Sequence, residues 1–258
     1  MTRHKMAGVE IAGLSKRYLI GNRQLFALEE INLALEHGSF TAVVGKSGCG
    51  KTTLLRLLSG LEEKTDGQIT FTFDSNQDSA AARRVGIVFQ EPRLMPWLTV
   101  KENIGFSLLK EKKQTSNEDV LAKYLQLLGL EPFKDAYPAQ ISGGMAQRVA
   151  LGRALCYDPG LILMDEPFGA LDYFTRKNLQ NEMVNLFLSQ KKTFVFVTHD
   201  VEEAVYLSQK VVVLNAGRMS GEFIVDLPYP RQTTSPQFLA VREQIYNAIM
   251  EVNSVSRV

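Results

Sequence analysis

The sequence predicts an α/β fold, in which short buried strands alternate with helices. Two apolar runs, at 161–164 and 194–198, are short and sharply bounded, as strands buried on both faces of a parallel sheet are. Residues 171–189 lie between them and are long enough to form the helix that connects parallel neighbours. Near the N-terminus, residues 9–14 and 31–35 alternate apolar and polar side chains, which indicates half-exposed strands.

The other elements follow in chain order. Turn-forming pairs at 21–22 and 66–67 separate the N-terminal strands, and further strands are predicted at 68–71 and 85–89. From about 91 to 160 the pattern becomes helical, which predicts a helical block inserted into the α/β core. We expect helices there at 99–110, from a capping box at 116–119 through 128, and from 142 to about 158. The chain then continues with a strand at 211–214, a turn at Gly217 and a weakly helical stretch at 232–258.

The composition is that of an ordinary soluble domain, with 258 residues, 45% of them hydrophobic and 22% charged. Because 29 basic residues face 28 acidic ones, no positive field is expected to attract nucleic acid. No apolar stretch follows the basic residues 1–5, so no signal peptide is expected, and no apolar run approaches the roughly 18 residues that span a bilayer. Two cysteines, Cys49 and Cys156, are too few for a disulfide framework, which favours a reducing, cytosolic setting.

A phosphate-binding loop is the most specific motif. Residues 45–52 match the pattern G-x-x-x-x-G-K-[ST], as Gly45, Lys46, Ser47, Gly48, Cys49, Gly50, Lys51 and Thr52. A strand-like run at 40–44 precedes the loop, and a helix-like run that opens at Thr53 follows it. In such a loop the backbone N–H groups and the helix N-terminus face a polyphosphate, while Lys51 adds charge and the Thr52 hydroxyl can bind Mg²⁺. The alternative, a glycine-rich turn with an incidental lysine, is disfavoured by the flanking strand and helix.

Two carboxylates follow the buried strand at 161–164. Asp165 emerges at the carboxyl end of the strand, where ligands collect in open α/β sheets, and can hold Mg²⁺ directly or through water. Glu166 comes next and can polarise a water molecule for attack on a phosphate. The alternative is an acidic strand end or a helix cap, which would carry far more weight without a phosphate loop in the same chain.

A second candidate anion site lies at 141–148. Ser142 can cap the helix that follows, and Gly143 and Gly144 can let a phosphate approach its free N–H groups. Taken alone, this Ser-Gly-Gly sequence would usually be a loop. About ninety residues separate it from the first anion site.

These motifs, in this order and spacing, resemble the ATP-binding cassette family of transport ATPases. The resemblance covers about residues 8–225 and rests on 45–52, Gln90, 141–148, 161–166, 170–172 and 198–200. It implies a P-loop NTPase fold, that is, an α/β RecA-like core with an antiparallel β subdomain and an inserted helical subdomain at about 91–160. Residues 226–258 would then be a C-terminal extension that packs on the core.

The resemblance also implies roles for single residues. Tyr18 would stack on adenine, Gln90 would sense Mg²⁺ and the γ-phosphate, and His199 would contact the γ-phosphate. Asp172 would cross a dimer interface. Without the resemblance, Tyr18 is more often a packed strand-edge residue and His199 a structural one. Asp172 can also be the N-cap of the helix at 172–189, and both roles can hold.

The implied working unit is a head-to-tail homodimer that encloses two ATP molecules, each between the phosphate loop of one copy and the 141–148 motif of the other. That motif departs from the family at Ile141 and at Met145-Ala146, while Ser142, Gly143 and Gly144 are intact. An oxidised or alkylated thiol at Cys49 is expected to obstruct the nucleotide.

The segment 90–104 is the expected contact with a polytopic membrane permease. Two prolines stiffen it, and Leu94, Met95 and Trp97 are suitable interface anchors, although they could instead pack inside the helical lobe. The sequence of this segment, together with that of residues 167–172, resembles the importer branch for nitrate, sulfonates and taurine. That branch also includes uptake systems for thiamine-precursor pyrimidines. We therefore expect a peripheral ATPase on the cytoplasmic face of the cell membrane, working indirectly with an extracytoplasmic solute-binding protein.

Other functions remain open at this stage. An exporter or lipid-handling cassette would carry the same motifs. A soluble repair or translation cassette would need a long coiled-coil insertion or a second cassette. Both are disfavoured, because Ser142 follows Gln90 by only 52 positions and the sequence has one phosphate loop. A P-loop kinase would not need Ser142, Gly143 and Gly144. The transported solute does not follow from the sequence.

Overall fold

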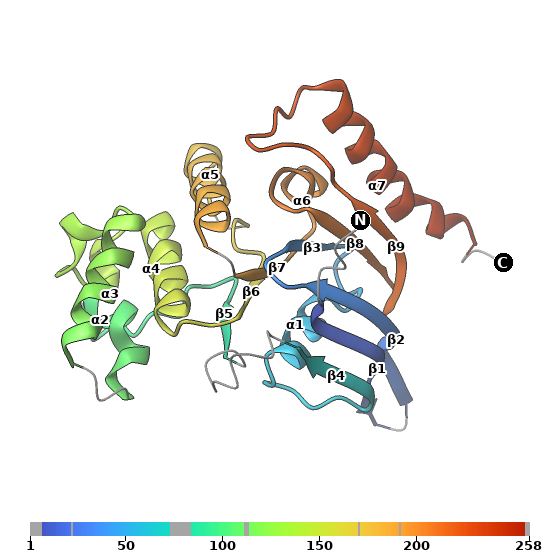
Figure 1. The fold of residues 1–258 in the computed structure, drawn as a ribbon. Helices are drawn as coiled ribbons and strands as arrows, with labels where there is room; N and C mark the ends of the chain where they lie inside the picture. The colour runs from blue at the N-terminus through green and yellow to red at the C-terminus, as the bar shows by residue number, and fades with distance from the viewer. Residues whose placement is uncertain are drawn as a thin grey trace.

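The computed structural model describes residues 7–21, 23–72, 84–110, 114–169, 171–190 and 192–255. A central sheet of six strands in the order β5-β6-β7-β3-β8-β9 organises the fold (Figure 1). The strands are β5 (Val85–Val88), β6 (Leu161–Asp165), β7 (Thr193–Thr198), β3 (Phe40–Val44), β8 (Lys210–Asn215) and β9 (Arg218–Ile224). Neighbours from β5 to β8 pair in parallel, and β9 returns antiparallel to β8 after the turn at Gly217. The strands predicted at 85–89, 161–164, 194–198 and 211–214 are thus confirmed within a residue or two.

The central strands are apolar throughout because helices or a second sheet cover both faces. All five residues of β3 are buried. Phe40 and Val44 pack in one core cluster with Phe196 and the helices that follow in the sequence, whereas Val43 packs on the opposite side with α1. Alternate residues of one strand therefore join two cores, one on each side of the sheet.

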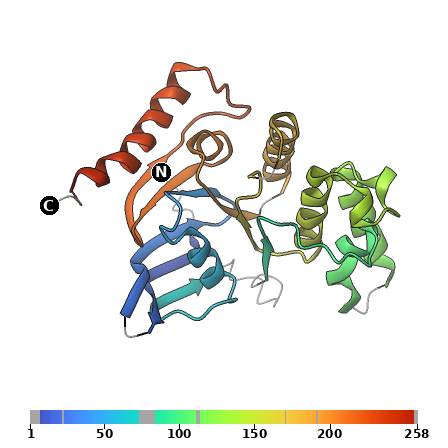
Figure 2. The ribbon, with the colours of Figure 1, turned by 180° about the vertical axis from the view of Figure 1, so that it is seen from behind.

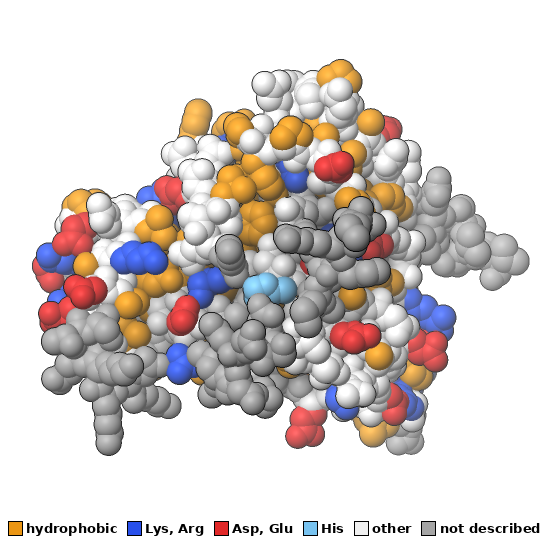
Figure 3. All heavy atoms as spheres, viewed as in Figure 1, with side chains coloured by type: hydrophobic (Ala, Val, Ile, Leu, Met, Phe, Trp, Pro, Cys, Tyr) orange, Lys and Arg blue, Asp and Glu red, His pale blue; other side chains and the backbone are white. Residues whose placement is uncertain are grey.

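Helices cover the two faces unequally (Figures 1 and 2). On one face, α5 (Tyr173–Ser189), α6 (Val201–Leu207) and α7 (Pro236–Val255) pack, and on the other lies α1 (Lys51–Leu58), next to the antiparallel sheet. On the face shown in Figure 3, acidic and basic side chains are mixed, and hydrophobic side chains gather between α5 and α6. Within the described residues, every helix is too short or too polar to cross a lipid bilayer.

The second sheet is antiparallel, in the order β2-β1-β4, with β1 at Ala7–Ile20, β2 at Arg23–Glu36 and β4 at Asp66–Phe71. The strands expected at 9–14 and 31–35 are confirmed, but both run longer than predicted. The turn predicted at 66–67 is wrong, because β4 already begins at Asp66. Gly67 instead allows β4 to lie close to β1, because a Cβ there would lie 2.3 Å from the carbonyl oxygen of Gly13 on β1.

The inserted lobe is helical, as predicted, with α2 (Val100–Gly105), a 3₁₀ turn (Phe106–Lys110), α3 (Gln114–Leu127) and α4 (Gly143–Cys156), besides short 3₁₀ turns at Glu131–Phe133 and Pro138–Gln140. The single helix expected at 99–110 is split where α-helix gives way to the 3₁₀ turn. The capping box expected at 116–119 is wrong, because α3 begins at Gln114. A capping box forms instead between Thr99 and Glu102 at the start of α2.

The C-terminal segment is joined to the core by a buried arginine. Phe238 and Ile245 of α7 are buried in the same core cluster as α6 and β8. Arg231, which is 6% exposed, lies just before this helix. Its guanidinium donates hydrogen bonds to the carbonyls of Val205, Tyr206, Ser208, Val225 and Leu227. The carbonyls at the end of α6, which have no partner within the helix, are thereby satisfied.

Candidate functional site

The phosphate-binding loop connects β3 to α1, as predicted. Two of its glycines are required by close neighbours. A Cβ on Gly45 would lie 2.2 Å from the carbonyl oxygen of Leu214, and one on Gly50, whose φ is 107°, would lie 2.5 Å from that of Ala27. The loop is therefore seated against β2 and the end of β8, which fixes its shape without any ligand.

Lys51 is held inside this loop. It is 6% exposed, and its ammonium Nζ donates hydrogen bonds to the carbonyls of Gly45 at 2.7 Å and Lys46 at 3.1 Å. The first turn of α1 contains no acidic residue. The ammonium and the positive end of the helix thus act in the same place, and the arrangement favours a bound anion.

The thiol of Cys49 faces the protein and not the solvent. The residue is 4% exposed, and a Cβ on Gly45 would lie 2.6 Å from its Sγ atom. Burial raises the pKa of the Cys49 thiol, with the nearby charge of Lys51 opposing the change. The reactive thiolate is therefore scarce at neutral pH, so the modification considered from the sequence is disfavoured in the folded chain.

Thr52, at the start of α1, and Asp165, at the end of β6, are in contact although they are 113 positions apart in the sequence. The Thr52 hydroxyl donates to Asp165 Oδ1 at 3.2 Å, the distance expected for two ligands that are brought to one centre. Burial is the main cause that raises the pKa of the Asp165 carboxyl, and the neighbouring Glu166 adds to it, while the Thr52 hydrogen bond lowers it. A cation at this position would lower that pKa and favour the carboxylate.

Glu166, His199 and Gln90 converge at the carboxyl ends of β6, β7 and β5. The Nδ1 atom of His199 lies 3.2 Å from Glu166 Oε2. A Cβ on Gly169 would lie 3.7 Å from the same carboxylate oxygen and 3.9 Å from the Gln90 amide nitrogen. The Glu166 carboxylate and the Gln90 amide therefore flank the same position beside Gly169.

The backbone of Glu166 is unusual for a residue that is not glycine, with a φ of 42°. Its N–H donates to the carbonyl of Val197 at 3.0 Å, which holds it in place. Residues in this sparsely populated region cluster at functional sites, because the surrounding structure must over-determine them. The side chain of this residue is the one that contacts His199.

Tyr18 lies beside the end of the same loop. Its hydroxyl forms hydrogen bonds with Glu62 and Thr53, and burial raises its pKa. The Nζ atom of Lys16 sits 5.0 Å from the centre of the ring. Because Thr53 belongs to the first turn of α1, the ring is close to where a nucleotide held by the loop would extend.

Ser142 caps α4, as predicted, and its hydroxyl accepts a hydrogen bond from the Met145 N–H at 3.3 Å. The two glycines that follow differ. A Cβ on Gly143 would meet nothing within 4 Å, whereas one on Gly144 would lie 2.3 Å from Thr175 Cγ2. Gly144 therefore serves the contact between α4 and α5, and the role of both glycines toward a phosphate stays a prediction.

The two candidate anion sites lie apart within one chain. Figures 1 and 2 both place α4 in the helical lobe and α1 on the other side of the central sheet. Asp172, which is exposed, caps α5 and accepts hydrogen bonds from the N–H groups of Phe174 and Thr175, both at 3.1 Å. The N-cap interpretation of Asp172 is thus confirmed, and its role at an interface stays a prediction.

The segment after Gln90 is fixed by side chains that sequence reasoning missed. Asn103 is fully buried on α2, and its amide donates to the carbonyls of Met95, Leu98 and Thr99. On α4, Arg153 donates to the carbonyls of Pro92 and Arg93, and Gln147 to that of Phe89. The sequence does contain a signal for Asn103. In the helical pattern this polar residue falls on the same face as the apolar residues Val100 and Ile104.

Of the three expected anchors, Trp97 is 71% exposed. Leu94, in contrast, packs against the main core cluster. The core-packing interpretation therefore holds for Leu94, and the role of Trp97 as an interface anchor stays a prediction. The exposed indole belongs to a loop whose backbone carbonyls accept hydrogen bonds from the Asn103 amide. These hydrogen bonds restrict the movement of the loop.

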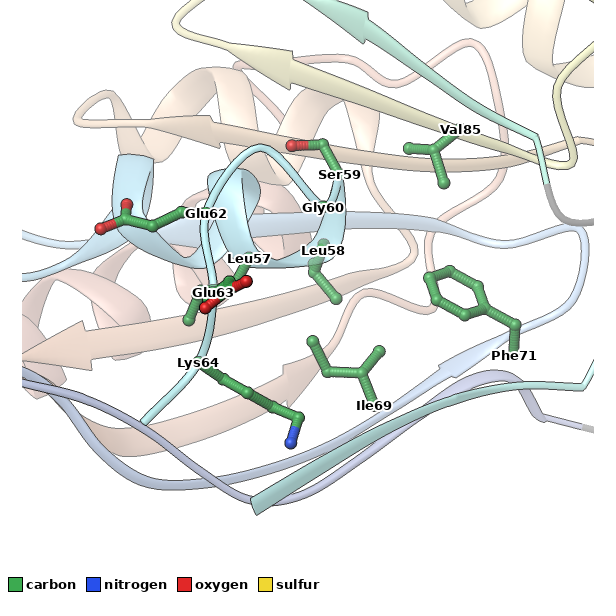
Figure 4. A pocket seen from close by; sticks show the side chains of 10 residues that line it. All are labelled: Leu57, Leu58, Ser59, Gly60, Glu62, Glu63, Lys64, Ile69, Phe71 and Val85. Carbon is green, nitrogen blue, oxygen red and sulfur yellow. The ribbon is translucent and has the colours of Figure 1, made fainter. Parts of the chain in front are cut away.

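A separate cavity of about 600 Å³ lies at the opposite end of α1 from the phosphate loop. Leu58, Ile69, Phe71 and Val85 contribute apolar side chains to it, and Lys64 and Glu63 lie at its side (Figure 4). The nucleotide-binding residues predicted from the sequence are absent from its lining. This cavity is therefore separate from the candidate site around the loop at 45–52.

Comparison with known proteins gives one consistent result. A sequence profile described as ABC transporter matches residues 28–169. An aliphatic sulfonates import ATP-binding protein of Bacillus cereus is 43% identical over 92% of this chain and 94% of its own length. The protein of the same name from Bacillus subtilis is 41% identical over 92% of each chain. An ABC transporter ATP-binding protein of Methanocaldococcus jannaschii is 45% identical over 94% of this chain and 91% of its own.

The structural comparison agrees. An ATP-binding cassette solved as a dimer in a post-hydrolysis state, with ADP and Pi bound, superposes with a TM-score of 0.74 and 30% sequence identity, covering 85% of this chain and 100% of that one. The predicted fold class is confirmed: a P-loop NTPase with a RecA-like α/β core, an antiparallel β subdomain and an inserted helical subdomain.

Proposed function

Because this chain belongs to the ABC transporter family, we propose that it is the ATP-hydrolysing subunit of an importer for a small solute of the aliphatic sulfonate class. The observation that carries the proposal is the convergence of Glu166, His199 and Gln90 at the strand ends beside a complete phosphate loop. The solute class is supported by relatives from two Bacillus species that are named for sulfonate import and match over nearly their whole length.

The nucleotide would be held by residues 45–53. Backbone N–H groups of the loop, the Lys51 ammonium and the N-terminus of α1 would bind the phosphates, and Tyr18 would contact the base. Thr52 and Asp165, with Gln90 nearby, fit Mg²⁺, since a hydroxyl and a carboxylate 3.2 Å apart leave other ligand positions to phosphate oxygens and water. When bound, Mg²⁺ would neutralise charge on the β- and γ-phosphates. In the described residues no cluster of three or more His, Cys, Asp or Glu side chains is placed to hold a metal ion by itself.

Hydrolysis would proceed by in-line attack of a water molecule on the γ-phosphate. The Glu166 carboxylate would accept a hydrogen bond from this water and polarise it. His199 is positioned against the same carboxylate, so its other ring nitrogen can face the γ-phosphate. Lys51 would offset the charge that develops on the phosphate oxygens.

A second copy of the chain would complete each site in a head-to-tail homodimer. The N-terminus of α4, with Ser142 and Gly143, is exposed and lies far from the phosphate loop of its own chain. An anion site of this kind can act on a nucleotide only if another copy presents one. Asp172, exposed at the start of α5, would cross the same interface. The dimeric state of the related cassette supports this arrangement.

The membrane partner would be a permease that docks on residues 90–104. The exposed Trp97 side chain offers an aromatic anchor on a loop that Asn103 and Arg153 hold rigidly, and rigid aromatic anchors are typical of interface hot spots. The protein would then be peripheral at the cytoplasmic face of the membrane. An extracytoplasmic binding protein would deliver the solute to the permease.

Two experiments test the proposal. Glu166→Gln, which keeps the shape of the side chain but removes its charge, should trap a dimer in the presence of Mg-ATP, as measured by size-exclusion chromatography with light scattering. Turnover equal to that of the wild type would remove Glu166 from its role. The solute class is tested by purifying the partner binding protein and titrating it with sulfonates, nitrate and pyrimidines. Binding of a pyrimidine and no sulfonate would overturn the solute assignment alone.

A further inference from the structure

A chain of polar contacts joins the loop that carries Asp172 to the loop that carries His199. The two loops already meet once, where His199 Nδ1 lies 3.2 Å from Oε2 of Glu166, which is on the same loop as Asp172, and a second connection joins them further from the site. The connection runs through Arg176 on α5 and Glu203 on α6, whose side chains meet between the two helices.

Glu203 anchors the His199 end of this connection. The residue is 7% exposed, and its Oε2 atom accepts a hydrogen bond from the Thr198 hydroxyl at 2.8 Å. The same hydroxyl accepts the N–H of Asp200 at 3.1 Å. His199 therefore lies between Thr198, which donates to the Glu203 carboxylate, and Asp200, whose N–H donates to the same Thr198 hydroxyl.

Arg176 anchors the other end. Its Nη2 atom donates to the carbonyl of Leu171, the residue before Asp172, at 3.0 Å. Its Nε atom lies 3.9 Å from Glu203 Oε1, and within the described part of the chain this buried nitrogen has no hydrogen-bond partner. A distance of 3.9 Å exceeds a hydrogen bond by about 1 Å. A small shift of the loop at Leu171 would therefore make or break this contact.

Charge and burial make the contact consequential. An unpaired buried N–H destabilises its surroundings, so the arrangement in which Arg176 Nε reaches the Glu203 carboxylate is favoured once the loop permits it. Gln180, also on α5, donates to Glu203 Oε1 at 3.2 Å and keeps the carboxylate facing this helix.

We propose that Glu203 is a positioning residue that couples the placement of Asp172 to that of His199. The inference rests on the proposed function, because Asp172 is moved by a second copy only if the dimer forms. Docking of that copy at Asp172 would shift Leu171, draw Arg176 onto Glu203 and, through Thr198, hold His199 in the position against Glu166 that it already occupies in the single chain. The position of His199 in one copy would thereby depend on the binding of the second copy.

The test compares this pair with a matched neighbour. Lys177 and Glu202 join the same two helices one residue away, with Lys177 Nζ 3.0 Å from Glu202 Oε1, but neither is bonded to Leu171 or Thr198 in the described contacts. Glu203→Gln and Arg176→Met are to be compared with Glu202→Gln and Lys177→Met in the full-length chain. For each variant, kcat and KM for Mg-ATP and the thermal midpoint are measured.

Glu203→Gln and Arg176→Met should each lower kcat about tenfold, with KM for ATP changed less than about twofold, and the double variant should be no worse than the poorer single one. The Glu202 and Lys177 variants should stay within about twofold of the wild type. Thr198→Val breaks the connection at its other end and should reproduce the loss of kcat, which keeps the test decisive if Glu203→Gln folds poorly.

Wild-type kcat in Glu203→Gln or Thr198→Val, or losses in the two single variants that multiply in the double, would overturn the coupling. That result leaves the proposed function intact, because the wild type and the Glu202 variant would still hydrolyse ATP and dimerise. A wild type that neither dimerises nor turns over Mg-ATP with its permease would instead overturn the proposed function.

Discussion

The Nδ1 atom of His199 lies 3.2 Å from Oε2 of Glu166, and the two residues are 33 positions apart in the sequence. Their strands, β7 and β6, are parallel neighbours, so their carboxyl ends bring both side chains to the same edge of the sheet. The contact leaves the Nε2 atom of the imidazole for a ligand. Removing either side chain should therefore affect the same step.

His199→Ala should lower kcat about 100-fold and leave KM for ATP within about threefold, because the imidazole acts in the transition state more than in ground-state binding. Combined with Glu166→Gln, it should add little further loss, as residues that act as a unit are not additive. His37→Ala, on the exposed turn between β2 and β3, is the control and should behave as wild type. A double variant in which both losses multiply would show that the two residues act separately.

Gly144→Ala should destabilise the fold by about 1–3 kcal/mol, because its methyl group would lie against Thr175 Cγ2. Urea unfolding without nucleotide measures the effect. Adding Thr175→Ser removes that methyl group and should restore most of the stability. Gly143→Ala meets open space and should stay within about 1 kcal/mol of the wild type. Equal losses at the two glycines would contradict this assignment.

Trp97→Ala should weaken binding to the permease about 30-fold, as loss of a hot-spot aromatic does, without changing the thermal midpoint of the isolated chain. The reason is that the side chain is 71% exposed and packs little against its own protein. Affinity for the detergent-solubilised permease is the measurement. Leu127→Ala, on the exposed side of α3, is a control that should bind normally. Retained binding in the Trp97 variant would exclude the indole as an anchor.

Asp165→Asn should stabilise the metal-free chain at neutral pH while abolishing Mg²⁺-dependent hydrolysis. Burial raises the pKa of Asp165 in the folded state, so the folded chain binds the proton more tightly than the unfolded chain does. The charged carboxylate therefore costs stability above the raised pKa, and this cost disappears as pH falls toward the ordinary aspartate value. Urea midpoints from pH 7 to pH 4 should show the gain from the substitution shrinking. A gain that is constant with pH would argue against burial of the charge as its cause.

The sequence determines the parts of the site that depend on local pattern. The phosphate loop, the carboxylates after β6 and the caps at Ser142 and Asp172 each follow from a few adjacent residues, and the structure has the loop and both caps where expected. Long-range contacts decide the rest. The sequence does not show that Gly144 is also needed for packing, because Thr175, which a side chain at 144 would meet, is on another helix.

Errors in the elements have the same origin. The residues at 116–119 have the composition of a capping box, but α3 begins before them, so propensity alone does not locate a helix start. At 66–67 the pattern of a turn is overridden because β4 must pass close to Gly13. The surface loop suggested by the polar residues at 74–82 lies outside the described residues.

Arg231 has a consequence for where this chain can be cut. Its guanidinium closes the last turn of α6, the helix whose first residues follow His199, while the arginine itself belongs to the segment beyond residue 225. Truncating the chain after residue 225 would remove the Arg231 hydrogen bonds to the end of α6. The segment that carries Arg231 therefore stabilises the helix that follows His199. A fragment that lacks this segment is expected to lose part of that support and would not represent the intact enzyme.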